Sequence, residues 1–187
     1  SGFVNKKTVS SDKKNVTLLV IGGSQGCHFF NKKIPNLLSK IGSDLKVIHI
    51  AGSEASWVRE KYMQLNIDAK VHVFCDKMAE IYHQADFVVA RSGALTLSEL
   101  SLNGLPSFLV PYPHAAANHQ LLNAQYYERS GAAKVISEDE DELLNALKLM
   151  MSDSFRSQMS QNVELLAKPH AAVQIVQKLQ AMLNATQ

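Results

Sequence analysis

Three stretches of the sequence carry residues whose types could bind a phosphate or a sugar. The first is the run Gly22-Gly23-Ser24-Gln25-Gly26, which follows an apolar segment at 16–21. Glycines let the backbone approach a ligand closely, and free amides at the start of a following helix attract an anion. The spacing differs from the G-x-G-x-x-G of dinucleotide-binding proteins, and glycines after a strand also serve simple tight turns. From this run alone, phosphate binding and a plain turn both remain open.

The second stretch reads Arg91-Ser92-Gly93-Ala94-Leu95-Thr96 and continues to Glu99. Small residues after an apolar run again predict a turn into a helix start, so two such starts could bracket a diphosphate. Thr96 and Glu99 are three residues apart and share a helix face. The Glu99 carboxylate could accept hydrogen bonds from both hydroxyls of a ribose. The plainer alternative is a solvated glutamate, with Ser92 serving only as a cap.

The third stretch is rich in amides and contains two histidines. It runs from Pro111 through His114 to Asn118, after which His119, Gln120 and Asn123 open the next predicted helix. Amide and imidazole groups can bond to sugar hydroxyls without carrying charge, which suits a neutral hexosamine. Asn118 is also a good helix N-cap, so a purely structural role is the alternative.

One acidic run resembles a metal site but is better explained by helix capping. Asp139-Glu140-Asp141 is a literal D-x-D, yet it stands where a helix should begin, and acidic residues there complement the helix dipole. The two cysteines, Cys27 and Cys75, match neither a zinc pattern nor a disulfide framework, which fits a reducing cytosol. We therefore expect no metal and no cofactor.

The elements that must position these residues alternate regularly. Apolar periodicity predicts strands at 16–21, 46–51, 70–74, 86–90, 107–110 and 133–136. Helices are expected at 29–41, 54–65, 77–83, 95–103 and 118–130, with a helical tail over 139–184 that Pro169 should interrupt. The pattern predicts an α/β fold with a Rossmann-like, doubly wound parallel sheet of about six strands. In such sheets ligands bind at the carboxyl ends of the strands, where all three stretches stand.

Composition limits the classes of function. The chain has 187 residues, of which 46% are hydrophobic and 19% charged, as expected for one globular domain over 16–187. Residues 1–15 are polar and are expected to form a linker or a tag-derived tail. The formal charge of +2 is too small to suggest a nucleic-acid partner. No apolar run is long enough to span a membrane, so any membrane contact should be peripheral.

Taken together and in order, these stretches resemble the bacterial peptidoglycan N-acetylglucosaminyltransferases, a family of two-domain GT-B glycosyltransferases. The resemblance rests on residues 22–26, on 91–96 with Glu99, and on Gly104-Leu105-Pro106 through Pro111, His119-Gln120 and Asn123-Ala124. It is strong over about 16–136. It implies that the chain is the donor-binding half of a GT-B fold and that the acceptor-binding N-terminal domain, with its proposed base, has no counterpart here.

The resemblance also implies a role for each site residue. Gly22, Gly23, Ser24, Gln25 and Gly26 would meet the diphosphate of UDP-N-acetylglucosamine, which is a substrate and not a cofactor. Phe74, Cys75 and Met78 would lie beside the uracil. Leu95 and Thr96 would help to hold the phosphate region, and Glu99 would accept from the ribose hydroxyls. Arg91, Ser92 and Gly93 would also belong to the substrate-binding set. The sugar would be recognised by His119, Gln120 and Asn123.

For the whole enzyme, the resemblance implies transfer of N-acetylglucosamine to a lipid-linked muramyl-pentapeptide. The reaction would be a metal-independent, inverting displacement at the cytoplasmic face of the cell membrane, with peripheral attachment to its anionic surface. Alternatives are the donor-binding subunit of a split glycosyltransferase and a UDP-sugar epimerase. An epimerase needs acid and base carboxylates near the sugar, and only Glu99 lies in a motif. A dehydrogenase is disfavoured because the dinucleotide fingerprint is absent.

Overall fold

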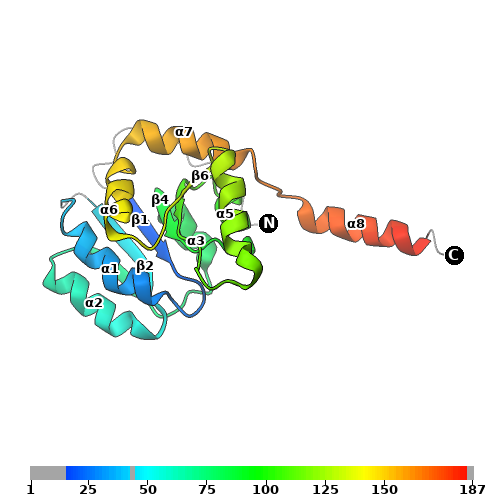
Figure 1. Cartoon of the computed structure of the whole chain (residues 1–187). Helices are drawn as coiled ribbons and strands as arrows, with labels where there is room; N and C mark the ends of the chain where they lie inside the picture. The colour runs from blue at the N-terminus through cyan, green and yellow to red at the C-terminus, as the bar shows by residue number, and fades with distance from the viewer. Residues whose placement is uncertain (1–15, 43–44, 185–187) are drawn as a thin grey trace.

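The chain folds around one parallel sheet with helices on both faces (Figure 1). The structure is a computed structural model and describes residues 16–42 and 45–184, so the predicted tail at 1–15 lies outside the described residues. Within them the six strands lie in the order β3-β2-β1-β4-β5-β6, and every pairing is parallel. This is the doubly wound, Rossmann-like order, and it confirms the predicted fold class.

Each strand is short and is followed along the chain by at least one helix. The strands are β1 (Val16–Ile21), β2 (Leu45–Ile50), β3 (Ala69–His72), β4 (Phe87–Ala90), β5 (Ser107–Leu109) and β6 (Ala133–Val135). The helices are α1 (His28–Leu38), α2 (Ala55–Gln64), α3 (Met78–Gln84), α4 (Ala94–Leu102), α5 (His119–Arg129), α6 (Glu140–Leu149), α7 (Asp153–Glu164) and α8 (Ala171–Asn184), with two short 3-10 turns, η1 (Gly52–Glu54) and η2 (Ala116–Asn118).

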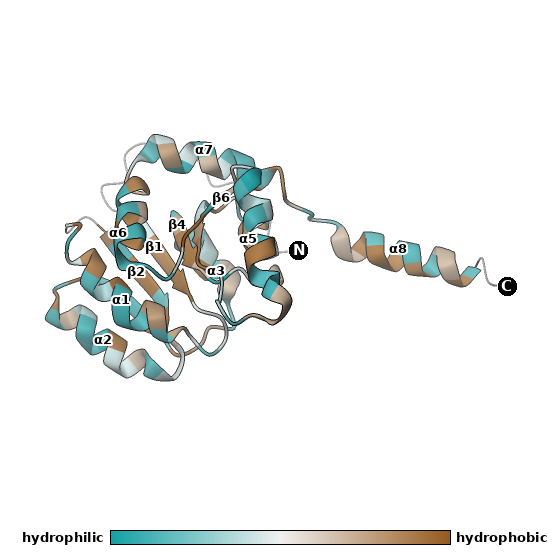
Figure 2. Ribbon diagram, in the orientation of Figure 1, coloured by the Kyte–Doolittle hydropathy of each residue, from teal (hydrophilic) through white to brown (hydrophobic). Residues whose placement is uncertain are grey.

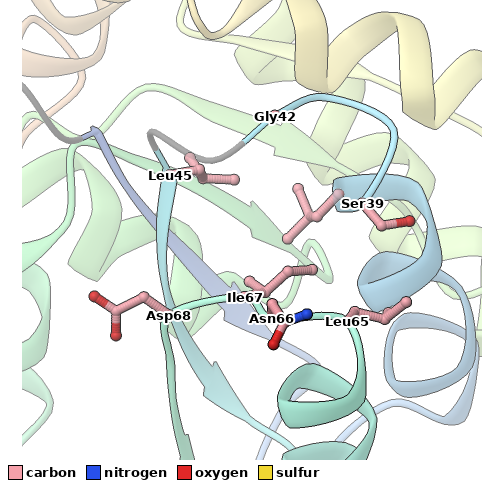
Figure 3. A pocket seen from close by; sticks show the side chains of 8 residues that line it. Ser39, Gly42, Leu45, Leu65, Asn66, Ile67 and Asp68 are labelled. Carbon is pink, nitrogen blue, oxygen red and sulfur yellow. The ribbon is translucent and has the colours of Figure 1, made fainter.

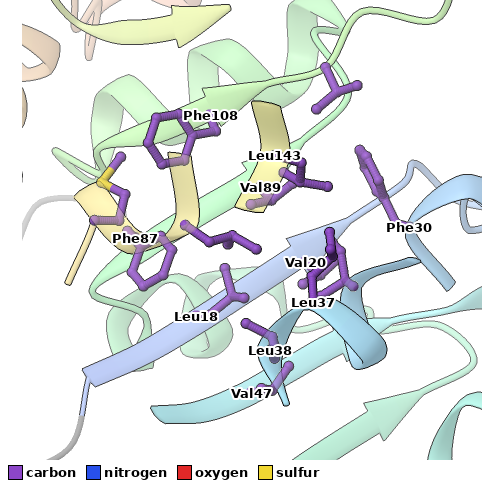
Figure 4. Packing of buried hydrophobic residues seen from close by; sticks show 14 of the residues in the cluster. Leu18, Val20, Phe30, Leu37, Leu38, Val47, Phe87, Val89, Phe108 and Leu143 are labelled. Carbon is purple, nitrogen blue, oxygen red and sulfur yellow. The ribbon is translucent and has the colours of Figure 1, made fainter. Parts of the chain in front are cut away.

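Alternate residues of the strands face two separate cores. On one face Leu18 and Val20 of β1 lie with Phe87 and Val89 of β4 in one buried cluster (Figure 4). Side chains of α1, α2 and α6 belong to the same cluster. On the other face Leu19 and Ile21 pack beneath α3 and α4. Because both faces are covered, the central strands are apolar at nearly every position, which is why they read as continuous apolar runs.

The predicted boundaries agree with the structure to within one residue except at three places. Helix α1 ends at Leu38, three residues before its predicted end at Ile41. Strand β3 ends at His72, so Val73 and Phe74 lie beyond it and are exposed. The helical tail is broken near Pro169, as predicted, since α7 ends at Glu164 and α8 begins at Ala171. A second break separates α6 from α7, and the sequence analysis did not anticipate it. There Ser152 occupies the N-cap position of α7 with extended backbone angles.

Helix α8 extends away from the rest of the chain (Figure 1), and its apolar stripe is visible in Figure 2. Ile175, Val176, Leu179 and Met182 are all more than half exposed. Among the residues that the structure describes, α8 included, no helix is long and apolar enough to cross a membrane.

Candidate donor-binding site

The loop after β1 exposes its backbone at the carboxyl edge of the sheet. The Gly26 amide donates to the Gly23 carbonyl at 3.1 Å, which closes a tight turn, and Gly23, Ser24 and Gln25 are exposed. Gly26 has a φ of +80°, and a Cβ there would lie 2.3 Å from the Ala51 carbonyl oxygen. Only glycine therefore lets this loop pack against the end of β2 while its tip stays open.

The loop after β4 begins beside the loop after β1. Ile21 and Ala90 are register partners at the ends of these neighbouring strands, so the residues that follow start from the same edge. Gly93 is the N-cap of α4, and neither α1 nor α4 has a side-chain cap or an acidic residue in its first turn. Two helix starts with unsatisfied amides thus lie at adjacent strand ends, an arrangement suited to binding an anion.

Helix α6 begins in a different way. The Asp139 side chain accepts a hydrogen bond from the Glu142 amide at 2.8 Å, and three acidic residues occupy the first turn of the helix. The capping interpretation of the D-x-D run is therefore confirmed. Within the described part of the chain, no group of three or more His, Cys, Asp or Glu side chains could hold a metal ion.

Arg91, in the loop after β4, contacts the loops that follow three other strands. Its guanidinium donates to the Val110 and Pro111 carbonyl oxygens, each at 3.0 Å, and to the Cys27 Sγ at 3.2 Å, and it pairs with Glu138. Its carbon also lies 5.1 Å from the centre of the Phe30 ring. These contacts assign Arg91 an architectural role: it holds the segments after β1, β4, β5 and β6 in place.

Ser92, Gln120 and Asn123 join the loop after β4 to the start of α5. Ser92 is fully buried, and its hydroxyl donates to the Gln120 carbonyl at 2.8 Å. Asn123 Nδ2 donates to the Ser92 carbonyl at 3.2 Å, and Gln120 Oε1 accepts from the Tyr112 amide at 3.0 Å. The structure therefore brings together residues 92, 120 and 123, which lie far apart in the sequence. Within the described residues, Gln120 Nε2 and Asn123 Oδ1 carry no hydrogen bond.

His119 is exposed at the first position of α5. Its Nδ1 lies 2.8 Å from the Ala116 carbonyl oxygen, so this nitrogen carries the proton. In the tautomer with its proton on Nδ1, Nε2 is an acceptor. Asn118 occupies the N-cap position as expected, but its backbone is left-handed, with φ +53°, and its side chain forms no capping bond.

Apolar side chains flank the two glycine-containing loops. Phe74 is 62% exposed, and Cys75 and Met78 are half-buried against the core beneath α3. Leu95, at the second position of α4, is 73% exposed, and Thr96 is half-buried. Phe74 and Leu95 thus present apolar surface on which a planar base could rest.

Glu99 has a partner that the sequence analysis missed. The Tyr82 hydroxyl donates to Glu99 Oε2 at 2.7 Å, while the Tyr82 ring is buried in the core on the α3 side. From the sequence, Tyr82 reads as one more core residue of a short amphipathic helix. Its spacing from Glu99, 17 positions away, contains no signal of the contact.

His28 is a second residue that the sequence analysis missed. It opens α1 directly after the glycine loop and is largely exposed, and its Nδ1 lies 2.8 Å from Glu54 Oε1. A hydrogen bond from Asn31, and then the one from His28, lower the pKa of Glu54. His28 is thus a polar group held at the helix start that faces the candidate anion site.

The cavity in Figure 3 lies at the opposite edge of the sheet. Its volume is about 300 Å³, and it is lined by residues that precede β2 and β3 or begin β2, among them Leu45 and Asp68. Ligands of doubly wound sheets bind at the carboxyl ends of the strands. We therefore do not assign this cavity to the candidate site.

Comparison with known proteins gives one family and many relatives. Residues 17–177 match the profile of the glycosyltransferase family 28 C-terminal domain. A UDP-N-acetylglucosamine–N-acetylmuramyl-(pentapeptide) pyrophosphoryl-undecaprenol N-acetylglucosamine transferase of Pseudomonas putida is 39% identical over 183 residues, which are 93% of this chain and 50% of the relative. The protein with the same description from Desulfotalea psychrophila is 38% identical over 181 residues, or 92% of this chain and 49% of that protein.

Solved structures agree with the fold. The crystal structure of Acinetobacter baumannii MurG superposes with a TM-score of 0.85 at 28% identity, covering 92% of this chain and 51% of that one. A UDP-N-acetylglucosamine 2-epimerase superposes with a TM-score of 0.64 at 14% identity, over 92% of this chain and 44% of the epimerase, and shows a shared fold alone. The chain spans about half the length of the curated relatives it matches.

Proposed function

Because this chain belongs to the glycosyltransferase family 28 C-terminal domain family, we propose that it binds UDP-N-acetylglucosamine as the sugar donor of a glycosyltransferase. The observation that carries the proposal is the pairing of Ile21 with Ala90, which sets two uncapped helix starts side by side. In this proposal the diphosphate lies across the N-termini of α1 and α4. Backbone amides and the Ser24 hydroxyl bind its oxygens.

The remaining groups recognise the nucleoside and the sugar. Uracil rests against Phe74, Cys75 and Met78, and the ribose hydroxyls donate to Glu99. The free acceptor of His119 and the free groups of Gln120 and Asn123 face the N-acetylglucosamine. Ser92 and Arg91 act indirectly, since their polar groups bond within the protein.

In the proposed reaction an acceptor hydroxyl attacks the anomeric carbon of the sugar, the bond to the diphosphate breaks, and UDP leaves with the electron pair. Inversion follows from a single displacement. This chain contributes donors already aimed at the leaving diphosphate, which is electrostatic preorganisation. The acceptor and the base that takes its proton belong to the half of the relatives that this chain does not cover.

The activity named for the relatives supports a finer proposal. We propose that the acceptor is the undecaprenyl-pyrophosphoryl muramyl-pentapeptide and that the reaction serves peptidoglycan synthesis. The complete enzyme then works at the cytoplasmic face of the membrane through a peripheral contact. An epimerase reaction gains no support from the residues predicted to bind the donor, because Glu99 is the one carboxylate among them and an epimerase needs both an acid and a base near the sugar.

Calorimetry of this chain tests the proposal. UDP-N-acetylglucosamine should bind more tightly than UDP-glucose, UMP or NAD. Glu99→Ala should weaken UDP-N-acetylglucosamine binding by about 10- to 100-fold, the usual effect of losing a charged hydrogen-bond acceptor. Glu60→Ala, on the exposed face of α2, is the matched control and should leave the affinity unchanged. A preference for NAD, or no loss with Glu99→Ala, would contradict the proposal.

A further inference from the structure

A buried tyrosine reaches the candidate ribose-binding carboxylate from inside the core. Tyr82 lies in α3 and is only 1% exposed, and it belongs to the buried apolar cluster that also contains Leu97 and Leu100 of α4. The Tyr82 hydroxyl donates a hydrogen bond to Glu99 Oε2, at a distance of 2.7 Å. A buried phenol needs a polar partner, and here that partner is a residue of the candidate site.

The bond engages one carboxylate oxygen and leaves the other available. Glu99 is half-buried, and within the described residues its Oε1 accepts no hydrogen bond. A glutamate on a helix surface usually samples several rotamers. The Tyr82 hydroxyl selects those that keep Oε2 at the core, so the position of Oε1 is restricted as well.

The direction of the bond follows from the environment of the phenol. The pKa of Tyr82 is raised above its ordinary value. Burial is the largest cause, and the hydrogen bond to Glu99 and the charge of that carboxylate add to it. The phenol therefore stays protonated and donates the hydrogen bond, and the Glu99 carboxylate accepts it. Bonds of this charge-assisted kind are among the stronger ones in proteins.

We propose that Tyr82 is a positioning residue: by holding Glu99 Oε2, it aims Oε1 at the ribose hydroxyls of the bound nucleotide and sets the preference for ribose over deoxyribose. This inference rests on the proposed function, since it takes a uridine nucleotide as the ligand. It adds a residue that makes no contact with the ligand. A purely structural tyrosine would instead only link α3 to α4.

A matched pair of variants separates these two roles. Tyr82→Phe removes one hydroxyl that bonds to Glu99. Tyr127→Phe removes another hydroxyl that bonds to α4, where it contacts the Leu97 carbonyl at 3.0 Å and the Ser101 hydroxyl at 2.7 Å. Both variants lose hydrogen bonds to the same helix, but only the first changes a bond to Glu99.

The measurement is the ratio of dissociation constants for 2′-deoxy-UDP and UDP, obtained by calorimetry on this chain, with 3′-deoxy-UDP as a second analogue. Each analogue gives one ratio, its dissociation constant divided by that of UDP. In the Tyr82→Phe variant the larger of these two ratios should be roughly 3- to 10-fold lower than in the unmodified chain, the usual range for one hydrogen bond. Tyr127→Phe should leave both ratios unchanged even where its melting temperature falls. Adding Tyr82→Phe to Glu99→Gln should cause no further loss.

Different results would overturn the proposed function and the role of Tyr82. If the unmodified chain binds no UDP, the proposed function fails and the inference fails with it. If Glu99→Gln lowers the ratios and Tyr82→Phe does not, only the role of Tyr82 is overturned. Should Tyr82→Phe unfold, Glu99→Asp tests the same geometry, because its shorter carboxylate cannot reach both Tyr82 and the ribose. Unchanged ratios in that variant would also overturn the inference.

Discussion

Ile21 and Ala90 are register partners at the carboxyl ends of β1 and β4, and the two loops of the candidate site leave the sheet from this pair. Strand pairing fixes the spacing between these loops before any side chain contributes. The α1 and α4 starts that follow them point unsatisfied amides at the same region.

Ser24→Ala should slow sugar transfer in a protein that also contains the acceptor-binding half. The Ser24 hydroxyl is exposed at the tip of the glycine loop, where it can bind the leaving diphosphate. Removing one preorganised donor of this kind typically lowers the rate by about 100- to 1,000-fold. Steady-state kinetics measure the effect, and Ser130→Ala at the far end of α5 is the control. Unchanged turnover would remove Ser24 from the mechanism.

Arg91→Lys should destabilise the chain although it preserves the charge. A lysine cannot reproduce the bonds to Val110 and Pro111 together with the contact to Cys27. We expect the free energy of unfolding to fall by about 1 to 3 kcal/mol in urea titrations, from the loss of buried hydrogen bonds. The Cys27 thiol, which is now buried, should react faster with a thiol reagent. If Arg91 instead contacts the ligand, donor affinity should fall without these two changes.

Protonation of His49 should contribute to acid unfolding. The side chain is fully buried in β2, with Nδ1 3.0 Å from the Tyr62 hydroxyl, and burial lowers its pKa to about 3. In the unfolded chain the pKa is near 6.5, so below this pH the unfolded state takes up a proton that the folded state does not. Stability should therefore fall between pH 6.5 and about 3, by up to about 1.4 kcal/mol per pH unit from this group.

His49→Gln removes that titration and is the comparison. Its free energy of unfolding should depend less steeply on pH over the same interval, although the variant starts from a lower stability. If the free energy of unfolding depends on pH equally steeply in both proteins, His49 does not contribute to acid unfolding.

Asp139→Ala should lower stability without weakening donor binding. Loss of the bond to the Glu142 amide removes the cap of α6, which typically costs about 1 kcal/mol. A chelator should also leave the affinity for UDP-N-acetylglucosamine unchanged, because the diphosphate is held by amides and hydroxyls. Loss of binding in the variant or with the chelator would point to a metal site at the D-x-D run.

The sequence by itself determined the fold class and the edge of the sheet at which the candidate residues lie. Apolar runs of strand length alternating with helical segments specify a parallel sheet, and small residues after β1 and β4 mark the turns. These signals are local, because backbone conformation and periodicity depend on neighbouring residues. The same local signal identified Asp139 as a cap. It did not reveal the break between α6 and α7.

Only the tertiary structure decided which of the candidate residues bond within the protein and so hold the candidate site together. Arg91 and Ser92 look like ligand-binding residues in the sequence, yet their polar groups bond to Val110, Pro111 and Gln120. Tyr82 looks like core and touches Glu99. Such partners are chosen by packing between segments distant along the chain, and no periodicity encodes which hydrogen-bond donor meets which acceptor.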